Sequence, residues 1–166
     1  MKRAYSLLLF VFLWSISIPV ISQDETAVEP YEVLEISGVI SHNDKGLGES
    51  LVELFEGNKV IDAFETKNNG KFKFNLMNEK IYTIQISKKG YYTKRISVST
   101  KMPQGIDDDF KFAFDIGMTM KEEAAFDPYL SEYPSALIAY DEKRKEFRYD
   151  KNYTKSYFDE IEPSEE

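Results

Sequence analysis

ETKNNGKFKFNL, residues 65–76, places an Asn-Asn-Gly turn directly before a segment in which every second residue is apolar. An apolar residue at every second position is typical of a β-strand that buries one face, because successive side chains point to opposite sides of the sheet. We expect Asn69-Gly70 to form a type I′ turn, since both central residues of that turn need positive φ angles and Asn-Gly supplies them. The stretch therefore predicts a β-hairpin in the middle of the chain.

Six further segments between residues 33 and 120 carry strand-like patterns, and turn-forming residues separate them at intervals of ~8–12 residues. The last one is the most regular, because every even-numbered residue from Phe110 to Met120 is apolar. No helical period of useful length interrupts this series. Seven short strands in this arrangement predict an all-β fold, a seven-stranded antiparallel sandwich. The apolar residues of the other five segments are Leu34, Ile36, Gly38 and Ile40; Val52 and Leu54; Val60, Ile61 and Phe64; Tyr82, Ile84 and Ile86; Ile96 and Val98.

The N-terminal residues have the three parts of a secretory signal peptide. Lys2 and Arg3 form a basic start, an apolar run follows from Leu7 to Ile18, and a small residue, Ser22, precedes a polar segment. The apolar run is shorter than the ~20 residues that an ordinary membrane-spanning helix needs. We therefore expect residues 1–22 to be removed on export, leaving no stable membrane span. An uncleaved anchor is the alternative.

Residues 23–32 are acidic and lack an apolar period, so we expect a flexible leader there. The whole chain has a formal net charge of −8, and removal of Lys2 and Arg3 with the signal peptide would bring it to −10. Nucleic acids and anionic membranes require clustered Lys and Arg, so this charge argues against both as partners. The chain contains no cysteine, which excludes disulfides and thiol chemistry.

Residues 121–166 form a Tyr-rich C-terminal extension with a different pattern. Ala136, Ile138 and Tyr140 alternate and can pair with Phe147 and Tyr149 in a small hairpin. Asp150 is then placed to cap a short helix, in which Tyr153, Tyr157 and Ile161 share one face. We expect this extension to pack partly on the sandwich, because its aromatic side chains would be costly to leave in water.

The order of elements in residues 34–100 resembles the carboxypeptidase regulatory-like domain. That family combines a Gly-containing first strand, a hydrophobic second strand, a Thr-x-x-x-Gly-x-Phe segment and a Tyr-x-Ile-x-Ile-x-x-x-Gly-Tyr segment. The matching positions here are Gly38, Val52, Thr66, Gly70, Phe72, Tyr82, Ile84, Ile86, Gly90 and Tyr91. The resemblance implies a transthyretin-like (prealbumin-like) sandwich over residues 33–120.

Members of that family are mostly accessory modules of secreted and cell-envelope proteins, especially in Bacteroidetes. The segment from Phe147 to Lys155 is similar to a motif in envelope proteins of the same phylum. These resemblances imply an exported protein, in the periplasm or on the surface of a Gram-negative bacterium, and they imply no reaction. The transthyretin-like fold also occurs in hydroxyisourate hydrolase, whose histidine set and Tyr-Arg-Gly-Ser end are absent here.

Side chains that could carry chemistry are few. His42 is the only histidine, and without a second His or a Cys it lacks the partners of a metal site, so we expect an exposed loop residue. Asp107, Asp108 and Asp109 could offer oxygen ligands to calcium, but their spacing matches no EF-hand loop and we expect them to be solvated. No motif pairs a nucleophile with a base. We therefore expect neither enzymatic activity nor a cofactor.

Two functions remain for such a chain. The first is a non-catalytic module that binds or scaffolds an envelope protein. The second is a carbohydrate-binding module that uses surface tyrosines, because aromatic rings are frequent at interfaces and can also stack on sugars. The candidate contact residues for either function are Tyr92, Tyr129, Tyr133 and Tyr140.

Overall fold

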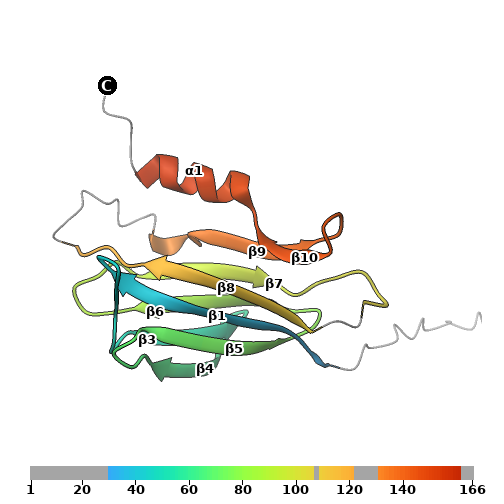
Figure 1. The fold of residues 1–166 in the computed structure, drawn as a ribbon, viewed down its shortest axis with the longest axis horizontal. Coiled ribbons are helices and arrows are strands. Elements are labelled where there is room, and N and C mark those ends of the chain that lie inside the picture. Colours follow the sequence, from blue (N-terminus) through green and yellow to red (C-terminus); the bar gives the residue numbers. More distant parts are fainter. Residues whose placement is uncertain (1–29, 107–108, 122–130, 162–166) are drawn as a thin grey trace, which may run out of the picture.

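The computed structural model describes residues 30–106, 109–121 and 131–161. In this part of the chain ten strands form two facing sheets, and one helix follows the last strand (Figure 1). The predicted all-β class is confirmed. The elements are β1 (Glu32–His42), β2 (Lys45–Gly46), β3 (Leu51–Glu56), β4 (Lys59–Glu65), β5 (Lys71–Met77), β6 (Ile81–Ser87), β7 (Lys94–Ser99), β8 (Phe110–Gly117), β9 (Ala136–Asp141), β10 (Glu146–Tyr149) and α1 (Lys151–Ile161).

The smaller sheet has β1 at its centre, with β8 on one side and both β5 and the short β2 on the other. The larger sheet has the order β10-β9-β7-β6-β3-β4. Two pairings, β1 with β8 and β7 with β9, are parallel. The prediction of a wholly antiparallel sandwich was therefore wrong. In each parallel pair a long connection returns the chain to the same end, as parallel pairing requires.

The core lies between the sheets and is formed by the residues that the alternating patterns placed on one face. Leu34, Ile36 and Ile40 of β1 are at most 1% exposed, and the inward-facing apolar residues of β3, β5, β6 and β7 are at most 4% exposed. Burial of each such side chain contributes ~1.5–3 kcal/mol. The buried set includes Val52, Leu54, Phe72, Phe74, Leu76, Tyr82, Ile84, Ile86, Ile96 and Val98.

The stretch 65–76 does not form the predicted hairpin. β4 pairs with β3 in the larger sheet, whereas β5 pairs with β1 in the smaller sheet, so the chain crosses between the sheets at this turn. Gly70 has a φ of 66°, but Asn69 does not have a positive φ, which excludes a type I′ turn. The Gly70 N–H donates to the Lys67 carbonyl at 2.8 Å, closing a β-turn with glycine in its fourth position.

Gly70 and Thr66 hold this crossing in place. A Cβ atom on Gly70 would lie 2.1 Å from the Ile40 carbonyl oxygen, so only glycine fits here. The buried Thr66 hydroxyl donates to the Leu47 carbonyl at 2.8 Å and accepts from the Ser50 N–H at 3.1 Å. These bonds satisfy polar groups that would otherwise be costly to bury.

Two strands are less buried than their sequences indicated. Val60 and Ile61 of β4 are 42% and 43% exposed, because β4 is an edge strand. In β8 the apolar side chains alternate with exposed ones as predicted. Phe114 and Ile116 are buried, whereas Phe110 and Phe112 are only half-buried. β8 ends at Gly117, and Met120 forms only an isolated bridge with Tyr91.

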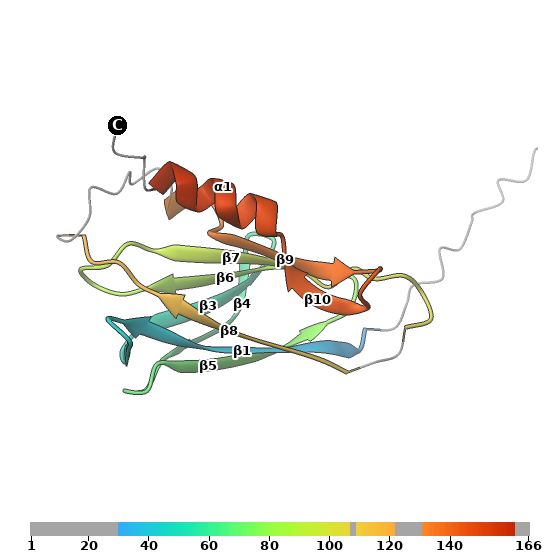
Figure 2. The same ribbon diagram turned by 45° about the horizontal axis from the view of Figure 1, so that its top comes forward.

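The hairpin and helix predicted for the C-terminal extension are confirmed. β9 pairs with β10 so that Tyr140 faces Phe147, and the Asp150 carboxylate accepts from the N–H groups of Asn152 and Tyr153, both at 3.0 Å, at the start of α1. The hairpin is part of the larger sheet, because β9 pairs with β7. Figures 1 and 2 show β9, β10 and α1 along one side of the sandwich.

The hairpin closes that side of the sandwich with aromatic rings. Phe110 of β8 lies edge-on to Tyr140 and Phe147, with ring centroids 5.4 and 5.3 Å apart, and Phe112 lies edge-on to Tyr149 at 5.2 Å. Such edge-to-face contacts add ~0.5–1.5 kcal/mol each beyond the area buried. The two sheets are thus joined across their edges by residues of the extension.

The predicted signal peptide lies outside the described residues, as does most of the leader. Among the helices of the described part, none is long and apolar enough to cross a membrane.

Candidate interaction surfaces

Tyr92 follows the turn at Gly90 and is half-buried rather than fully exposed. Its N–H donates to the Thr119 carbonyl at 3.0 Å, and the Lys121 ammonium lies 6.0 Å from the centre of its ring. Tyr91 packs against the core and lies edge-on to His42. Tyr92 is therefore a partly accessible residue whose backbone is fixed to the segment after β8.

Of the other three predicted tyrosines, two belong to the part of the chain that the structure describes. Tyr133 is 44% exposed in the turn that precedes β9. Tyr140 is half-buried, and its ring packs against Phe110 and Phe147 in the aromatic closure of the sandwich. Tyr129 lies outside the described residues. The packing of Tyr140 makes it a structural residue in this fold, because its ring fills the gap between the sheet edges.

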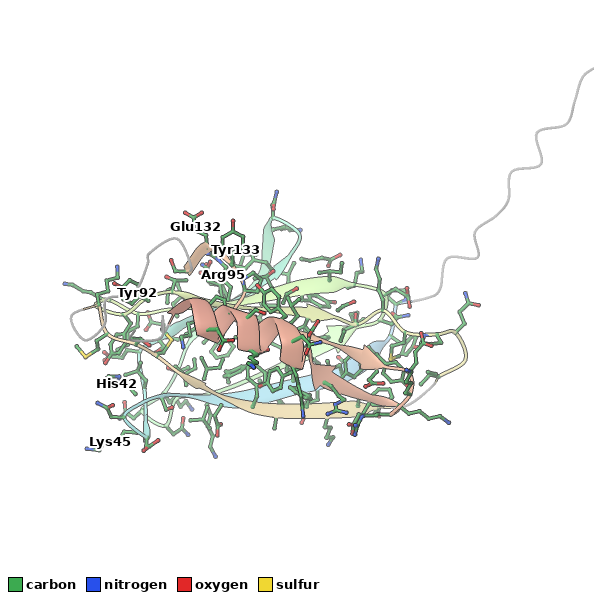
Figure 3. All side chains as sticks on the ribbon, turned by 90° about the horizontal axis from the view of Figure 1, so that it is seen from above. His42, Lys45, Tyr92, Arg95, Glu132 and Tyr133 are labelled. Carbon is green, nitrogen blue, oxygen red and sulfur yellow. The ribbon has the colours of Figure 1, made fainter. Side chains whose placement is uncertain are left out.

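The turn that carries Tyr133 is fixed to the larger sheet by Arg95. The Arg95 guanidinium donates to the Ser131 carbonyl at 2.5 Å and to the Gln85 side-chain oxygen at 2.7 Å, and Gln85 donates to Glu53 at 2.9 Å. A polar ladder thus crosses the outer face of β3, β6 and β7. Figure 3 shows Tyr92, Arg95, Glu132 and Tyr133 toward the same end of the molecule.

A second exposed region lies on the outer face of the larger sheet at β3, β4 and β6. Val60 pairs with Phe55, and a register shift beside this pair leaves Ile61 as an extra residue in β4. Ile81 of β6, which shares the outer face with Phe55, is 53% exposed. We call Phe55, Val60, Ile61 and Ile81 the outer-face patch.

Of the acidic residues of β4, Glu65 pairs with Leu51 and shares the outer face, whereas Asp62 pairs with the inward-facing Leu54. Asp62 and Glu65 are exposed on β4, while the Glu56 carboxylate accepts from the Lys80 ammonium at 2.6 Å. This contact raises the pKa of Lys80, through the hydrogen bond first and the charge of Glu56 second. The bulge at Ile61 and the charges on β4 oppose strand addition at this edge. A partner would therefore contact the side chains of the outer face rather than pair with the backbone of β4.

His42 is not the exposed loop residue that its sequence context indicated. It is half-buried as the last residue of β1, and its Nδ1 lies 3.0 Å from the Met118 carbonyl oxygen. A carbonyl only accepts, so Nδ1 carries the proton and Nε2 accepts from the Asn43 amide at 3.0 Å. The ring links the end of β1 to the segment after β8, which is a structural role.

A small cavity lies where the start of β7 and the end of β8 meet the start of β9, the end of β10 and α1. Its volume is 130 Å³, and its walls include Ile96, Phe114 and Ala136 together with Lys94 and Thr154. Lys94 shares the inner face of β7 with Ile96 and Val98, because side chains alternate along a strand. Burial lowers the pKa of the Lys94 ammonium, since a charged group is disfavoured away from water.

Tyr149 stands beside this cavity. Burial raises the pKa of its phenol to about 12, and the negative charge of Asp115 adds to the effect. Asp115 itself is exposed, because it alternates with the inward-facing Phe114 and Ile116. The phenol therefore remains a neutral hydrogen-bonding group across the physiological pH range.

No group of His, Asp or Glu that could hold a metal ion occurs among the described residues. Asp107 and Asp108, two of the three aspartates considered for calcium, lie outside those residues, and Asp109 is exposed.

The two sheets define the class of the protein as a β-sandwich with an integrated C-terminal hairpin and helix. No family model matches the chain, and no curated protein matches it. Among solved structures, it is similar to 3-chlorocatechol 1,2-dioxygenase from Rhodococcus opacus 1CP, with a TM-score of 0.36 and 10% identity over 52% of this chain and 59% of that chain.

A dioxygenase domain from Streptomyces sp. SirexAA-E, part of a fusion with a carbohydrate-binding protein, gives a TM-score of 0.39 and 11% identity over 55% of this chain and 80% of that chain. A type II cohesin–X-dockerin complex from Acetivibrio cellulolyticus gives a TM-score of 0.37 and 19% identity over 55% and 60%. The chain thus spans about three fifths of the dioxygenase from Rhodococcus opacus. Likeness at this level carries no inference about activity.

Proposed function

We propose that this chain is a non-catalytic module of the bacterial cell envelope that binds a protein partner through the outer-face patch. The observation that carries the proposal is the exposure of Val60, Ile61 and Ile81, each more than two fifths exposed on the larger sheet. Contiguous exposed apolar residues with a polar rim are typical of protein-binding surfaces. Glu65, which is exposed on the same face of β4, favours a partner with a basic residue beside its apolar contact.

The cellular setting belongs to the same proposal. The basic start, apolar run and small residue of residues 1–22 support export, to the periplasm or the surface of a Gram-negative bacterium. The element order in residues 34–100 supports a relationship to the carboxypeptidase regulatory-like domain. The intact mass of the protein recovered from envelope fractions tests export, and a chain that retains Met1 in the cytoplasm would contradict it.

Site-specific photo-crosslinking in the native host tests the partner surface. A photoreactive amino acid at position 61 should give a discrete crosslinked species, and the same group at Lys45, exposed on β2, should give none. Val60→Asp should abolish the crosslink from position 61, because it puts a charge in the apolar centre of the contact. Identical products from positions 61 and 45 would contradict the proposal.

Carbohydrate binding is a second candidate, favoured by the anchored turn at residues 131–133. Tyr133 is exposed next to Glu132, and Arg95 holds their backbone in place. An aromatic ring beside a carboxylate is suited to a sugar, since the ring stacks on the sugar face and the carboxylate accepts from its hydroxyl groups. Glycan-array binding that is lost in both Tyr133→Ala and Tyr92→Ala but retained in Val60→Asp would establish this function instead.

A further inference from the structure

We propose that the cavity at Lys94 binds the carboxylate group of a small ligand with a short apolar chain. The first step of the argument is the position of Lys94. Its side chain lies on the same face of β7 as Ile96 and Val98, which are 2% and 0% exposed, so a cation stands at the end of the apolar core. Lys94 itself is half-buried, and an ammonium group partly removed from water is destabilised unless an anion pairs with it.

The second step is the absence of an internal partner. Within residues 30–106, 109–121 and 131–161, no carboxylate lies within 4.0 Å of the Lys94 ammonium, and no hydrogen bond from it is found. Asp115 also borders the cavity, but it points outward at the mouth. The side chains that do face the same space are apolar or carry neutral hydroxyl groups.

The third step is the match between cavity and ligand. Ile96, Phe114 and Ala136 offer an apolar wall, and Tyr149 also lines the cavity. Ser135 and Thr154 line it as well, but their hydroxyl groups donate to the carbonyls of Arg95 and Asp150. A volume of 130 Å³ is well below the ~300–1,000 Å³ of sites for drug-sized ligands. It corresponds to roughly four water molecules. A group of the size of propionate therefore fits, with its carboxylate at Lys94 and its methyl group on the wall.

The same chemistry could be presented by a free short-chain acid or by the C-terminal residue of a peptide, since both carry a carboxylate next to a small apolar group. Two probes distinguish these sources: sodium propionate, and a tetrapeptide ending in alanine with a free or an amidated C-terminus. Amidation removes the charge and leaves the rest of the peptide unchanged. Loss of peptide binding on amidation therefore reports recognition of the carboxylate.

The experiment is titration of the full mature chain with each probe, followed by amide NMR shifts at Gly117, Ser135 and Thr154. We expect saturable shifts at these residues and a rise in the Lys94 pKa as the ligand supplies the missing negative charge. Lys94→Met should weaken binding at least about tenfold, because a charge-assisted contact is lost. The matched control, Lys101→Met, removes an exposed lysine from the loop after β7 and should bind like the natural chain.

Asp115→Asn provides a second test, in which propionate affinity should rise rather than fall. Because Asp115 places a negative charge at the mouth, its removal should tighten propionate binding by about twofold to threefold. We expect the Lys94→Met variant to fold, because an apolar side chain of similar length replaces a partly desolvated cation. If Lys94→Met does not fold, Thr154→Val tests the cavity independently. Absence of saturable shifts with both probes, or equal affinity in Lys94→Met, would overturn the proposal. Neither result depends on the outer-face patch, so the two proposals fail separately.

Discussion

Arg95 donates to the backbone oxygen of Ser131 at 2.5 Å, and through this bond a residue of β7 holds the segment that leads into β9. The Arg95 carbonyl accepts from both the N–H and the hydroxyl group of Ser135, at 2.7 and 3.1 Å, on the same segment. The parallel pairing of β9 with β7 begins directly after these contacts. Arg95 is thus one of the residues that connect the sandwich to its C-terminal extension.

Arg95→Lys should destabilise the protein by about 1–2 kcal/mol, because lysine cannot reproduce two hydrogen bonds from one planar group. Urea denaturation gives the free energy of unfolding, and hydrogen exchange at Ala136 reports local loosening of β9. The control is Arg144→Lys, whose side chain is 64% exposed and 3.9 Å from Asp141, and it should change stability by less than about 0.5 kcal/mol. Equal effects of the two variants would show that Arg95 has no anchoring role.

Gly38 allows β1, β5 and β8 to approach one another. A Cβ atom at this position would lie 2.0 Å from the Phe114 carbonyl oxygen and 2.8 Å from the Phe72 ring, and backbone cannot move aside cheaply. Gly38→Ala should therefore cost about 3 kcal/mol in the free energy of unfolding.

Gly117→Ala is the matched control for Gly38→Ala, because nothing lies within 4 Å of a Cβ atom there. It should leave stability within about 0.5 kcal/mol of the natural chain. A Gly38→Ala protein with an unchanged midpoint of urea denaturation would refute this view of the smaller sheet.

Removal of the extension tests whether residues 33–120 are a self-sufficient domain. A chain that ends at Met120 loses Tyr140, Phe147 and Tyr149, which cover the rings of Phe110 and Phe112. It should therefore bind a hydrophobic dye and lose cooperative thermal unfolding, whereas the same chain continued to Glu166 should do neither. Cooperative unfolding of the shortened chain without dye binding would establish residues 33–120 as an independent unit.

Tyr149 should titrate late. Its folded pKa of about 12 lies above the ordinary value of 10.0, so the folded state holds the phenolic proton longer than the unfolded state. The stability that follows from this difference is fully present below pH 10 and is lost as the pH rises from 10 through about 12.

Phenolate absorbance as a function of pH measures this late titration. Tyr149→Phe should remove one late-ionising group from the titration curve of the natural chain. A titration curve whose late phase survives Tyr149→Phe would assign that phase to another residue.

The sequence predicted the local structure of this chain well. Phe72, Phe74 and Leu76 face the core as their alternation indicated, and Asp150 caps α1. Lys94 could also have been recognised, because it shares the parity of Ile96 and Val98 in β7. A lysine at the end of a strand is usually solvated, so its inward-facing position in the alternation does not by itself indicate burial. For Tyr140, in contrast, the sequence predicts a surface contact: its alternation with Ala136 and Ile138 specifies a face of β9, but not the ring of Phe110 that packs against it.

The amino-acid order by itself determined which residues form strands and which face of each strand is apolar, since both follow from side-chain alternation along one segment. Only the tertiary structure decided which strands are neighbours: β4 and β5 separate into different sheets after Gly70, and β8 and β9 each join a sheet in parallel. The physical reason is that alternation specifies a face but not a partner. The choice of partner depends on how the two apolar faces and their aromatic edges close together.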